Sequence, residues 1–245
     1  MDNASHFAVL THNIHKAVSP FSRRSSLTAL AREIAGSGAD LVFLQEIRGA
    51  DRQTPGPGQP QRLAEALGFQ VVYGKNAVYA RGHHGNAILS RYPLEFLSNQ
   101  DLSLSKLEQR GLLHARTRLP NGQQIHLFCL HLNLRKVDQA HQLTQVIAHL
   151  RQELPPGEPV LLAGDFNDWS ELLSDRLEGE LDLQEAGLSA NGRHARSFPS
   201  LLPVLSLDRI YYRGLALEDF AVLDGPDWRL LSDHLPLKAA FTLTS

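Results

Sequence analysis

Short apolar runs alternate with polar stretches along the whole chain, and this pattern predicts a protein built from both strands and helices. Nine runs rich in Val, Leu, Ile and Phe have the length of buried strands. We expect strands at residues 7–14, 40–47, 69–73, 87–90, 112–119, 125–132, 159–163, 207–212 and 235–243. Apolar residues at helical spacing predict helices at residues 27–34 and 137–154, with Gly36 and Pro155 near their ends.

Two segments interrupt this pattern and are expected to be loops. Residues 53–61 hold three prolines and two glycines, and residues 190–203 also interrupt the periodic pattern. The adjacent His83 and His84 suggest a transition-metal site, but in a strand they would point to opposite sides, and we expect them to lie in a loop, so we do not expect such a site. Since no linker or repeat divides the chain, we predict one α/β domain spanning residues 1–245.

The polar residues that end the apolar runs form the most informative pattern in the sequence. Strand-length runs lead to the amides, carboxylates and imidazoles of Asn13, Gln45, Glu46, His131, Asp165, Asn167, Asp208, Asp233 and His234. Taken singly, each has an ordinary explanation, such as a turn or a helix cap for an Asn or Asp. Because α/β proteins commonly gather strand ends at one edge of a sheet, the ordered set predicts a cluster there. Carboxylate and amide oxygens suit Mg²⁺, so this cluster is a candidate metal and phosphate site.

Composition and charge narrow the classes of function. The chain has 24 Lys and Arg against 26 Asp and Glu, which argues against coating nucleic acid by bulk charge but leaves a local basic groove open. Hydrophobic residues make up 42% of the chain, as in a globular protein with a large core. The single Cys129 lies in an apolar run and is expected to be a buried core thiol. The sequence has no evident signal peptide, lipidation motif or membrane-spanning run, so we expect a cytoplasmic protein.

Seven short motifs occur in an order that resembles the endonuclease/exonuclease/phosphatase superfamily. They lie at residues 11–14, 45–48, 85–90, 131–132, 164–167, 207–210 and 232–236, and include Gly-Asp-Phe-Asn and Ser-Asp-His-Leu-Pro. The resemblance extends from residue 7 to residue 241. It implies a four-layer α/β/β/α sandwich with two packed mixed β-sheets, and it implies cleavage of phosphoester bonds with Mg²⁺ or Mn²⁺.

The resemblance also implies roles for three residues on the metal side of the site. Glu46 is similar to the principal metal carboxylate, and Asn13 to the amide beside it at the metal or phosphate. Asp233 is similar to a further carboxylate near the metal. Such a set is sufficient in principle, because Mg²⁺ usually keeps several waters and needs only one or two carboxylates.

Five further residues resemble the catalytic positions of the superfamily. Asp165 is similar to the carboxylate that orients or deprotonates the attacking water, and Asn167 to the amide that stabilises charge on the phosphoryl oxygens. His234 resembles the imidazole that contacts the scissile phosphate, with Asp208 as the carboxylate that fixes it. His131 stands where the diesterase and phosphatase branches have a histidine that binds phosphate or assists the leaving oxygen. A carboxylate beside an imidazole is expected to raise its pKa and fix its tautomer.

Two residues are candidates for binding substrate. Arg48 stands where some nucleases of the superfamily place an arginine that grips phosphate, and an ordinary exposed arginine is the alternative. Asn133 either contacts substrate or caps the helix that begins near Arg135.

The motifs favour a small or lipid-linked phosphoester as the substrate. Apurinic-site endonucleases of the superfamily have a tyrosine motif where this chain has His131 and Leu132. Residues 13–16 and 196–199 look more like small bacterial members, some of them related to lipid phosphodiesterases. A Mg²⁺-dependent DNA or RNA nuclease is the alternative enzyme, and a binding module with a decayed site is the alternative of another class. Retention of the polar residues argues against a decayed site, because buried carboxylates are costly without a compensating cation. We expect a monomer.

Overall fold

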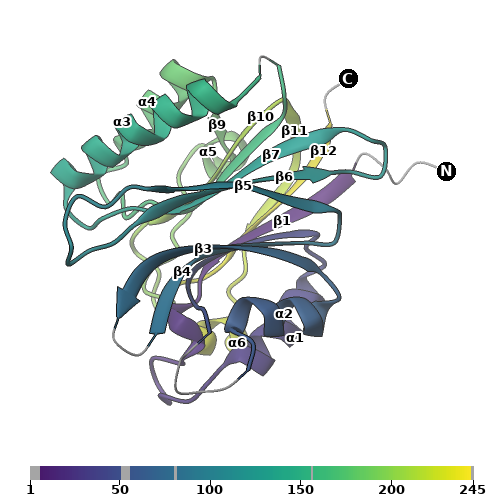
Figure 1. Cartoon of the computed structure of the whole chain (residues 1–245), viewed down its shortest axis with the longest axis vertical. Coiled ribbons are helices and arrows are strands. Elements are labelled where there is room, and N and C mark those ends of the chain that lie inside the picture. The colour runs from purple at the N-terminus through teal and green to yellow at the C-terminus, as the bar shows by residue number, and fades with distance from the viewer. Residues whose placement is uncertain (1–5, 51–55, 80–81, 156, 244–245) are drawn as a thin grey trace.

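The computed structural model describes residues 6–50, 56–79, 82–155 and 157–243, which form two β-sheets flanked by helices (Figure 1). The first sheet, in the order β11-β12-β1-β2-β4-β3, contains β1 (His6–Asn13), β2 (Leu41–Arg48), β3 (Gln70–Tyr79), β4 (Gly82–Ser90), β11 (Leu215–Val222) and β12 (Leu237–Leu243). The second sheet, in the order β5-β6-β7-β8-β10-β9, contains β5 (Leu94–Asp101), β6 (Gly111–Arg118), β7 (Gln124–His131), β8 (Val160–Asp165), β9 (Gln184–Glu185) and β10 (Asp208–Arg213).

The helices lie mainly on the outer faces of the two sheets, as Figure 1 shows. They are α1 (Leu27–Ser37), α2 (Gln59–Leu67), α3 (Lys136–Glu153), α4 (Leu173–Leu181), α5 (Ala186–Asn191), α6 (Pro226–Leu231) and the short 3-10 helix η1 (His15–Ala17). Helices α1, α2 and α6 cover the first sheet, and α3 and α4 cover the second. The layers therefore run helix, sheet, sheet, helix, which confirms the predicted sandwich.

Three apolar cores hold these layers together. Val9 of β1 packs between the two sheets, whereas its neighbour Leu10 packs against the helices on the outer face. Leu127 and Phe128 of β7 divide in the same way between the central core and the core under α3. Because side chains alternate across a strand, a strand covered on both faces needs apolar residues at nearly every position. This explains why the central strands read as continuous apolar runs.

The pairing of the strands brings the ends of several of them to one edge of the sandwich. Strand β1 is parallel to β2, and β7 is parallel to β8, so these four strands end on the same side. Strand β10 runs antiparallel to β8 and begins with Asp208 directly opposite Asp165. Strand β12 runs antiparallel to β1, so the residues that precede it lie at the end of β1. Starts and ends of strands therefore meet at one place.

All nine predicted strands and both predicted helices are present, with shifted boundaries. The sequence did not predict β5, β11, the two-residue β9, or the helices α2, α4, α5 and α6. Strands β5 and β11 lie at the edges of their sheets and are mostly half-buried or exposed. An edge strand with one solvent-exposed face lacks the continuous apolar run of a central strand, so the hydrophobic pattern that predicts it is weaker.

Three predictions about loops need correction. Helix α2 begins at Gln59 with a proline in its first turn, so the loop predicted for residues 53–61 is wrong at its end, while residues 51–55 lie outside the described residues. A proline fits there because the first helical N–H groups have no intrahelical partner. The loop predicted for residues 190–203 is correct apart from its first two residues, which end α5. His83 and His84 lie in β4 and not in a loop.

Two other expectations concern single features of the chain. Cys129 is completely buried in the central core, as predicted, and its sulfur lies 3.3 Å from Gln45 Nε2. Burial raises the pKa of this thiol to about 12, which makes it unreactive at neutral pH. Within the described ranges, no helix combines the length and the apolar character needed to cross a bilayer.

Candidate active site

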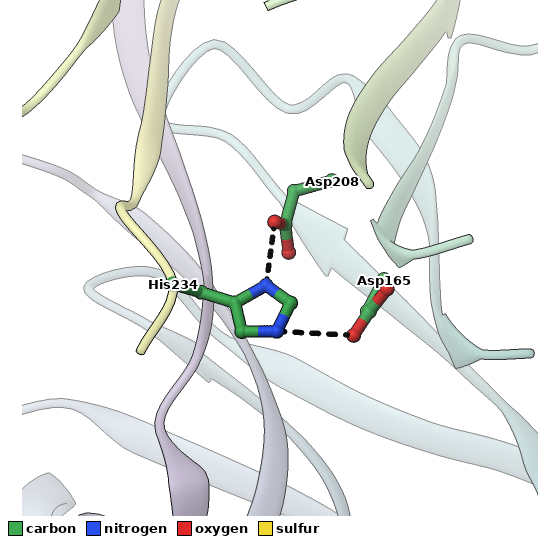
Figure 2. A group of neighbouring side chains, drawn as sticks. All are labelled: Asp165, Asp208 and His234. Carbon is green, nitrogen blue, oxygen red and sulfur yellow. Dashed lines mark hydrogen bonds and ion pairs between the residues drawn. The ribbon is translucent and has the colours of Figure 1, made fainter. Parts of the chain in front are cut away.

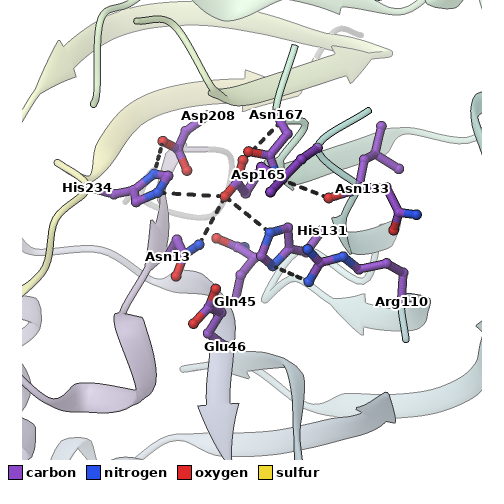
Figure 3. Close-up of polar contacts among 12 residues, drawn as sticks. Asn13, Gln45, Glu46, Arg110, His131, Asn133, Asp165, Asn167, Asp208 and His234 are labelled. Atoms are coloured by element: carbon purple, nitrogen blue, oxygen red, sulfur yellow. Dashed lines mark hydrogen bonds and ion pairs between the residues drawn. The ribbon is translucent and has the colours of Figure 1, made fainter. Parts of the chain in front are cut away.

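The carboxylate of Asp165, at the end of β8, lies at the centre of a polar cluster (Figure 3). Its Oδ2 accepts a hydrogen bond from Asn13 Nδ2 at 2.9 Å and lies 3.4 Å from His131 Nε2 and 3.8 Å from His234 Nε2. Its Oδ1 accepts a hydrogen bond from the backbone N–H of Asn167 at 3.0 Å. Residues from separate strand ends in the sequence thus converge on one carboxylate.

Burial sets the proton affinity of Asp165. The residue is 1% exposed. Burial raises the pKa of this carboxyl to about 6, although the nearby charge of His234 and the hydrogen bonds from Asn13 and Asn167 act to lower it. A carboxylate with a pKa close to neutral is ionised at pH 7 and is still able to accept a proton from a water molecule.

The imidazole of His234 lies between two carboxylates, as Figure 2 shows. Its Nδ1 donates to Asp208 Oδ2 at 2.8 Å, and its Nε2 faces Asp165. Ser197 Oγ donates a hydrogen bond to the same oxygen of Asp208. Burial alone would lower the pKa of His234, but the charges of Asp208 and Asp165 outweigh it and raise the pKa to about 10. The ring is therefore a cation at neutral pH, suited to stabilise a phosphate.

Ligand atoms of Asp165, Asp208 and His234 all lie within 4.8 Å of one another, a spacing that a metal ion could bridge. The protonation of His234 argues against this use, because an imidazolium donates through both ring nitrogens and has no lone pair for a metal. The trio is better suited to hold a proton and a phosphate than a cation. The second oxygen of Asp208 is buried and has no hydrogen-bond partner within the described residues.

Glu46 lies in a β-bulge of strand β2, which changes the direction of its side chain. The register between β2 and β4 shifts between Leu44 and Ile47, and Glu46 has a φ of 57°. Positive φ is rare for a residue with a long side chain, and such strain is found mainly at functional sites. A bulge of this kind re-aims a side chain that a regular strand would point elsewhere. The local backbone thus directs the Glu46 carboxylate differently from a regular strand position.

The carboxylate of Glu46 is ionised and paired with a lysine. Its Oε2 accepts a hydrogen bond from Lys16 Nζ at 2.9 Å. Burial alone would raise the pKa of Glu46, but the positive charges that His131 and Lys16 can carry outweigh this and lower it to about 2. Because burial and the Arg110 cation hold the pKa of His131 well below its ordinary value, His131 is neutral at pH 7. Lys16 is therefore the cation that acts on Glu46 under those conditions.

The donors on this side of the cluster fit a hard divalent cation. Glu46 offers a carboxylate, and Asn13 offers an amide oxygen whose partner among the described residues is the backbone N–H of His15 at 3.1 Å. A carbonyl oxygen has two lone pairs, so one remains for a metal. Oxygen donors of this kind, completed by water, are what Mg²⁺ and Mn²⁺ prefer.

His131, at the end of β7, connects the cluster to an arginine. Arg110 Nη1 lies 3.3 Å from His131 Nδ1, so the ring accepts there, and its proton lies on Nε2, facing Asp165. Arg110 also pairs with Glu108 at 2.8 Å and is only 13% exposed in its side chain. A neutral imidazole that donates from Nε2 is able to hydrogen-bond a phosphate or a leaving oxygen.

The family model described as the endonuclease/exonuclease/phosphatase family matches residues 10–234, which includes every residue of this cluster. The chain belongs to the endonuclease/exonuclease/phosphatase family. The uncharacterized protein YbhP of Escherichia coli K12 is 43% identical to it, over 97% of this chain and 96% of YbhP.

Solved structures of the endonuclease/exonuclease/phosphatase family share the fold at low sequence identity. A family protein from Beutenbergia cavernae is 23% identical with a TM-score of 0.82, covering 98% of this chain and 72% of that one. The mannosyl-6-phosphatase Bt3783 of Bacteroides thetaiotaomicron is 19% identical with a TM-score of 0.77, covering 97% of this chain and all of that one. Family members hydrolyse phosphoesters and typically depend on divalent metals.

Two residues that contact the cluster were given no role by the sequence. Arg110 precedes a predicted strand, and Lys16 follows Asn13 by three positions. The sequence pattern predicts site residues where apolar runs end, whereas Arg110 lies where one begins. Because β6 is antiparallel to its neighbour β7, its start lies at the same edge as the end of β7. A search for polar residues at both ends of each run would have found it.

Asn133 lies beside the cluster, but its polar groups are engaged elsewhere. Its Nδ2 donates to Asp138, while its Oδ1 accepts from Gln142 at 3.1 Å and its backbone carbonyl accepts from Gln139. These bonds tie the end of β7 to α3. The helix-cap alternative is wrong, because the N-cap position is Arg135. A contact between Asn133 and substrate stays a prediction.

Arg48 and Asp233 lie at the margin of the cluster. Arg48 is exposed and lines a cavity of about 270 Å³ together with Lys16, His83 and His84. Asp233 is partly exposed, and its Oδ1 accepts a hydrogen bond from Ser232 Oγ and lies 3.6 Å from His15 Nδ1. The roles predicted for Arg48 at phosphate and for Asp233 at the metal remain predictions.

Proposed function

We propose that the chain is a divalent-metal-dependent phosphoesterase in which water attacks the phosphorus directly, without a covalent intermediate. One observation carries the proposal: a buried carboxylate, Asp165, faces the Asp208–His234 pair on one side and the amide of Asn13 on the other. A base and an imidazolium within hydrogen-bond reach of one point are what hydrolysis of a phosphoester requires.

Glu46 and Asn13 would hold Mg²⁺ or Mn²⁺, since they supply an ionised carboxylate and an amide oxygen next to Asp165. When bound, the ion supplies Lewis-acid polarisation of a phosphoryl oxygen. Lys16 now pairs with Glu46, and a cation at Glu46 would compete with that pairing. We include Asp233 as a further carboxylate on the metal side of the site.

The remaining residues divide the chemical work. Asp165 takes the proton from the attacking water, because its pKa near 6 leaves it ionised at neutral pH. His234, held as a cation by Asp208, stabilises the charge on the phosphoryl oxygens. Asn167 assists, because its Nδ2 donates one hydrogen to the Leu132 carbonyl and has a second to offer. Neutral His131 donates a hydrogen bond from Nε2 to the leaving oxygen, which takes its proton from solvent as it departs.

The substrate that we propose is a small or lipid-linked phosphoester. The cavity beside Glu46 has a volume of about 270 Å³ and presents Arg48 and Lys16, which suits a compact anionic group. The similarity in fold to a mannosyl-6-phosphatase is consistent with a small substrate. We further propose that the chain acts as a single domain and as a monomer.

The test is hydrolysis of a substrate panel with Mg²⁺, with Mn²⁺ and with a chelator. The panel contains a chromogenic phosphodiester and monoester, sugar phosphates, phospholipid headgroups, supercoiled plasmid and an abasic duplex. We expect turnover of small substrates that the chelator abolishes, with little effect of salt. Efficient nicking of plasmid that is lost at high salt, together with no hydrolysis of the small substrates, would identify a nuclease instead. No hydrolysis of any substrate in the panel would favour a binding module whose catalytic site has decayed.

A further inference from the structure

Exposed apolar side chains are concentrated around the mouth of the active site. Fifteen large apolar side chains are exposed among the described residues, and ten of these lie in five segments: residues 15–26, 102–110, 132–138, 166–173 and 198–206. These segments hold 45 of the 245 residues, fewer than a fifth of the chain. Single exposed apolar residues are ordinary, but such a concentration marks a binding surface. We call the five segments the apolar rim.

Three segments of the apolar rim lie at the edge of the second sheet. Residues 102–110 end with Arg110, which contacts His131, and carry Leu107, which is 99% exposed. Residues 132–138 follow His131 directly and expose Leu134. Residues 166–173 contain Asn167 and expose Trp169. The side chain of Gln139 ties the last two segments together, because its Nε2 donates to the carbonyls of Leu134 and Asn167.

The other two segments lie next to the end of β1 and next to His234. Residues 15–26 follow the end of β1 and expose Phe21. Residues 198–206 begin with Phe198, whose ring lies 4.9 Å from that of His234, and expose Leu201 and Leu202. Each of the five segments therefore contains or adjoins a residue at or next to the catalytic cluster, so the apolar rim lies at the edge of the sandwich that holds the cluster.

The exposed charges of the apolar rim are almost all positive. Its exposed basic side chains are Arg23, Arg24, Lys106, Arg135 and Lys136, and its one exposed acidic side chain in the described structure is Glu171. Counted over all of their residues, the five segments hold seven Lys and Arg against four Asp and Glu, a formal charge of +3, whereas the whole chain carries −2. Asp168, the other acidic residue of its segment, is buried and bonded to the backbone N–H of Leu173.

We propose that the apolar rim docks the protein onto the surface of a lipid bilayer with anionic headgroups, with the active site facing the lipid. Trp and Leu side chains on separate segments, with Lys and Arg between them, suit insertion into the headgroup region. A protein partner would call for a more continuous apolar patch with fewer charged side chains within it. Docking onto the bilayer does not require the chain to be an enzyme. Only the inference that the substrate lies in the membrane rests on the proposed function.

Sedimentation with vesicles tests the docking. The full chain is mixed with vesicles of phosphatidylcholine alone and of phosphatidylcholine with phosphatidylglycerol. We expect binding to the anionic vesicles that weakens with salt. The variant with Leu107→Ser and Leu202→Ser should bind roughly tenfold or more weakly, because two apolar side chains no longer leave water. A matched control with Phe96→Ser and Leu188→Ser changes exposed apolar residues outside the rim and should bind like the unchanged chain.

A second measurement does not depend on the folding of the Leu variants. The chain has two tryptophans, and Trp228 is buried under the first sheet. In a Trp228→Phe chain, the emission of Trp169 should shift to shorter wavelength when anionic vesicles are added. No vesicle binding, no shift, or equal binding by the rim and control variants would overturn the docking proposal. If the His234→Ala chain binds vesicles but does not hydrolyse substrate, docking is independent of catalysis. If the chain instead forms dimers in solution through the rim, a second copy of the chain is the occupant and the docking proposal is wrong.

Discussion

At the scale of single residues, the pairing of Asp208 with His234 makes a specific prediction. Asp208 acts through the imidazole, since its Oδ2 accepts from His234 Nδ1 at 2.8 Å and its charge raises the pKa of that ring. We expect Asp208→Asn and His234→Ala each to lower kcat by roughly two to four orders of magnitude. The double variant should be no more than about tenfold worse than the worse single variant, because the two residues act as a unit. Losses that multiply would contradict the pair.

Glu46 allows a test of the metal that does not depend on turnover. Mg²⁺ that binds the folded chain should raise its midpoint of thermal unfolding. Glu46→Gln keeps the shape of the side chain and removes the charge, so we expect the stabilisation by Mg²⁺ to disappear. Glu95→Gln is a matched control, because Glu95 pairs with Arg116 on an exposed part of the second sheet. Equal stabilisation of all three chains by Mg²⁺ would remove Glu46 from the metal site.

At the scale of elements, one glycine positions Asp165 at the end of β8. Gly164 has a φ of 154°, and a Cβ added there would lie 2.0 Å from the carbonyl oxygen of Leu130 in β7. Gly164→Ala should therefore push β8 away from β7, which costs about 1–3 kcal/mol of unfolding free energy and displaces the carboxylate of Asp165. We expect denaturant unfolding to show this loss, together with a larger fractional loss of kcat/KM.

Gly179 provides the matched control for Gly164. It lies inside α4, and a Cβ added there would meet nothing within 4 Å. Gly179→Ala should be neutral or should stabilise the chain by up to about 1 kcal/mol, because alanine favours helix more than glycine. A Gly164→Ala chain as stable and active as Gly179→Ala would show that β7 and β8 can separate freely.

At the scale of the whole molecule, buried histidines predict sensitivity to acid. Burial lowers the pKa of His12 and of His84 to about 4 and that of His114 to about 3. The fold thus favours the neutral ring, so its contribution is present above the ordinary pKa of 6.5 and is lost as the pH falls towards the folded value. Each fully buried ring should cost roughly 2 kcal/mol between pH 6.5 and pH 5.

Denaturant unfolding at several pH values measures this loss. His114 stacks on Phe128 with ring centroids 4.0 Å apart, so His114→Phe keeps an aromatic ring while it removes the titration. The variant should have a shallower fall of unfolding free energy with acid than the unchanged chain. An identical fall in both chains would exclude His114 as a source of the acid sensitivity. His234 affects stability in the opposite direction. Its pKa of about 10 means that the fold favours the charged ring, so its contribution to the unfolding free energy is present below pH 6.5 and is lost as the pH rises towards 10.

The sequence by itself determined the central strands, the two long amphipathic helices and the polar residues that stand at the ends of those strands. Both faces of a central strand are buried, so the apolar runs appear directly in the sequence, and the polar residues that end them stand out. The edge strands β5 and β11 were not predicted because a half-wet strand leaves a weaker pattern. Helix α2 was obscured by the prolines that precede and begin it.

Only the tertiary structure decided which of those residues meet and in which state of protonation. The bulge that turns Glu46, the contact of Arg110 with His131 and the position of His234 between two carboxylates all depend on pairing between distant strands. Burial and neighbouring charges, which no local pattern reports, then give Asp165 a raised pKa and keep His131 neutral. A run of sequence specifies the chemical groups at a strand end, whereas the packing of the two sheets sets their distances and their charges.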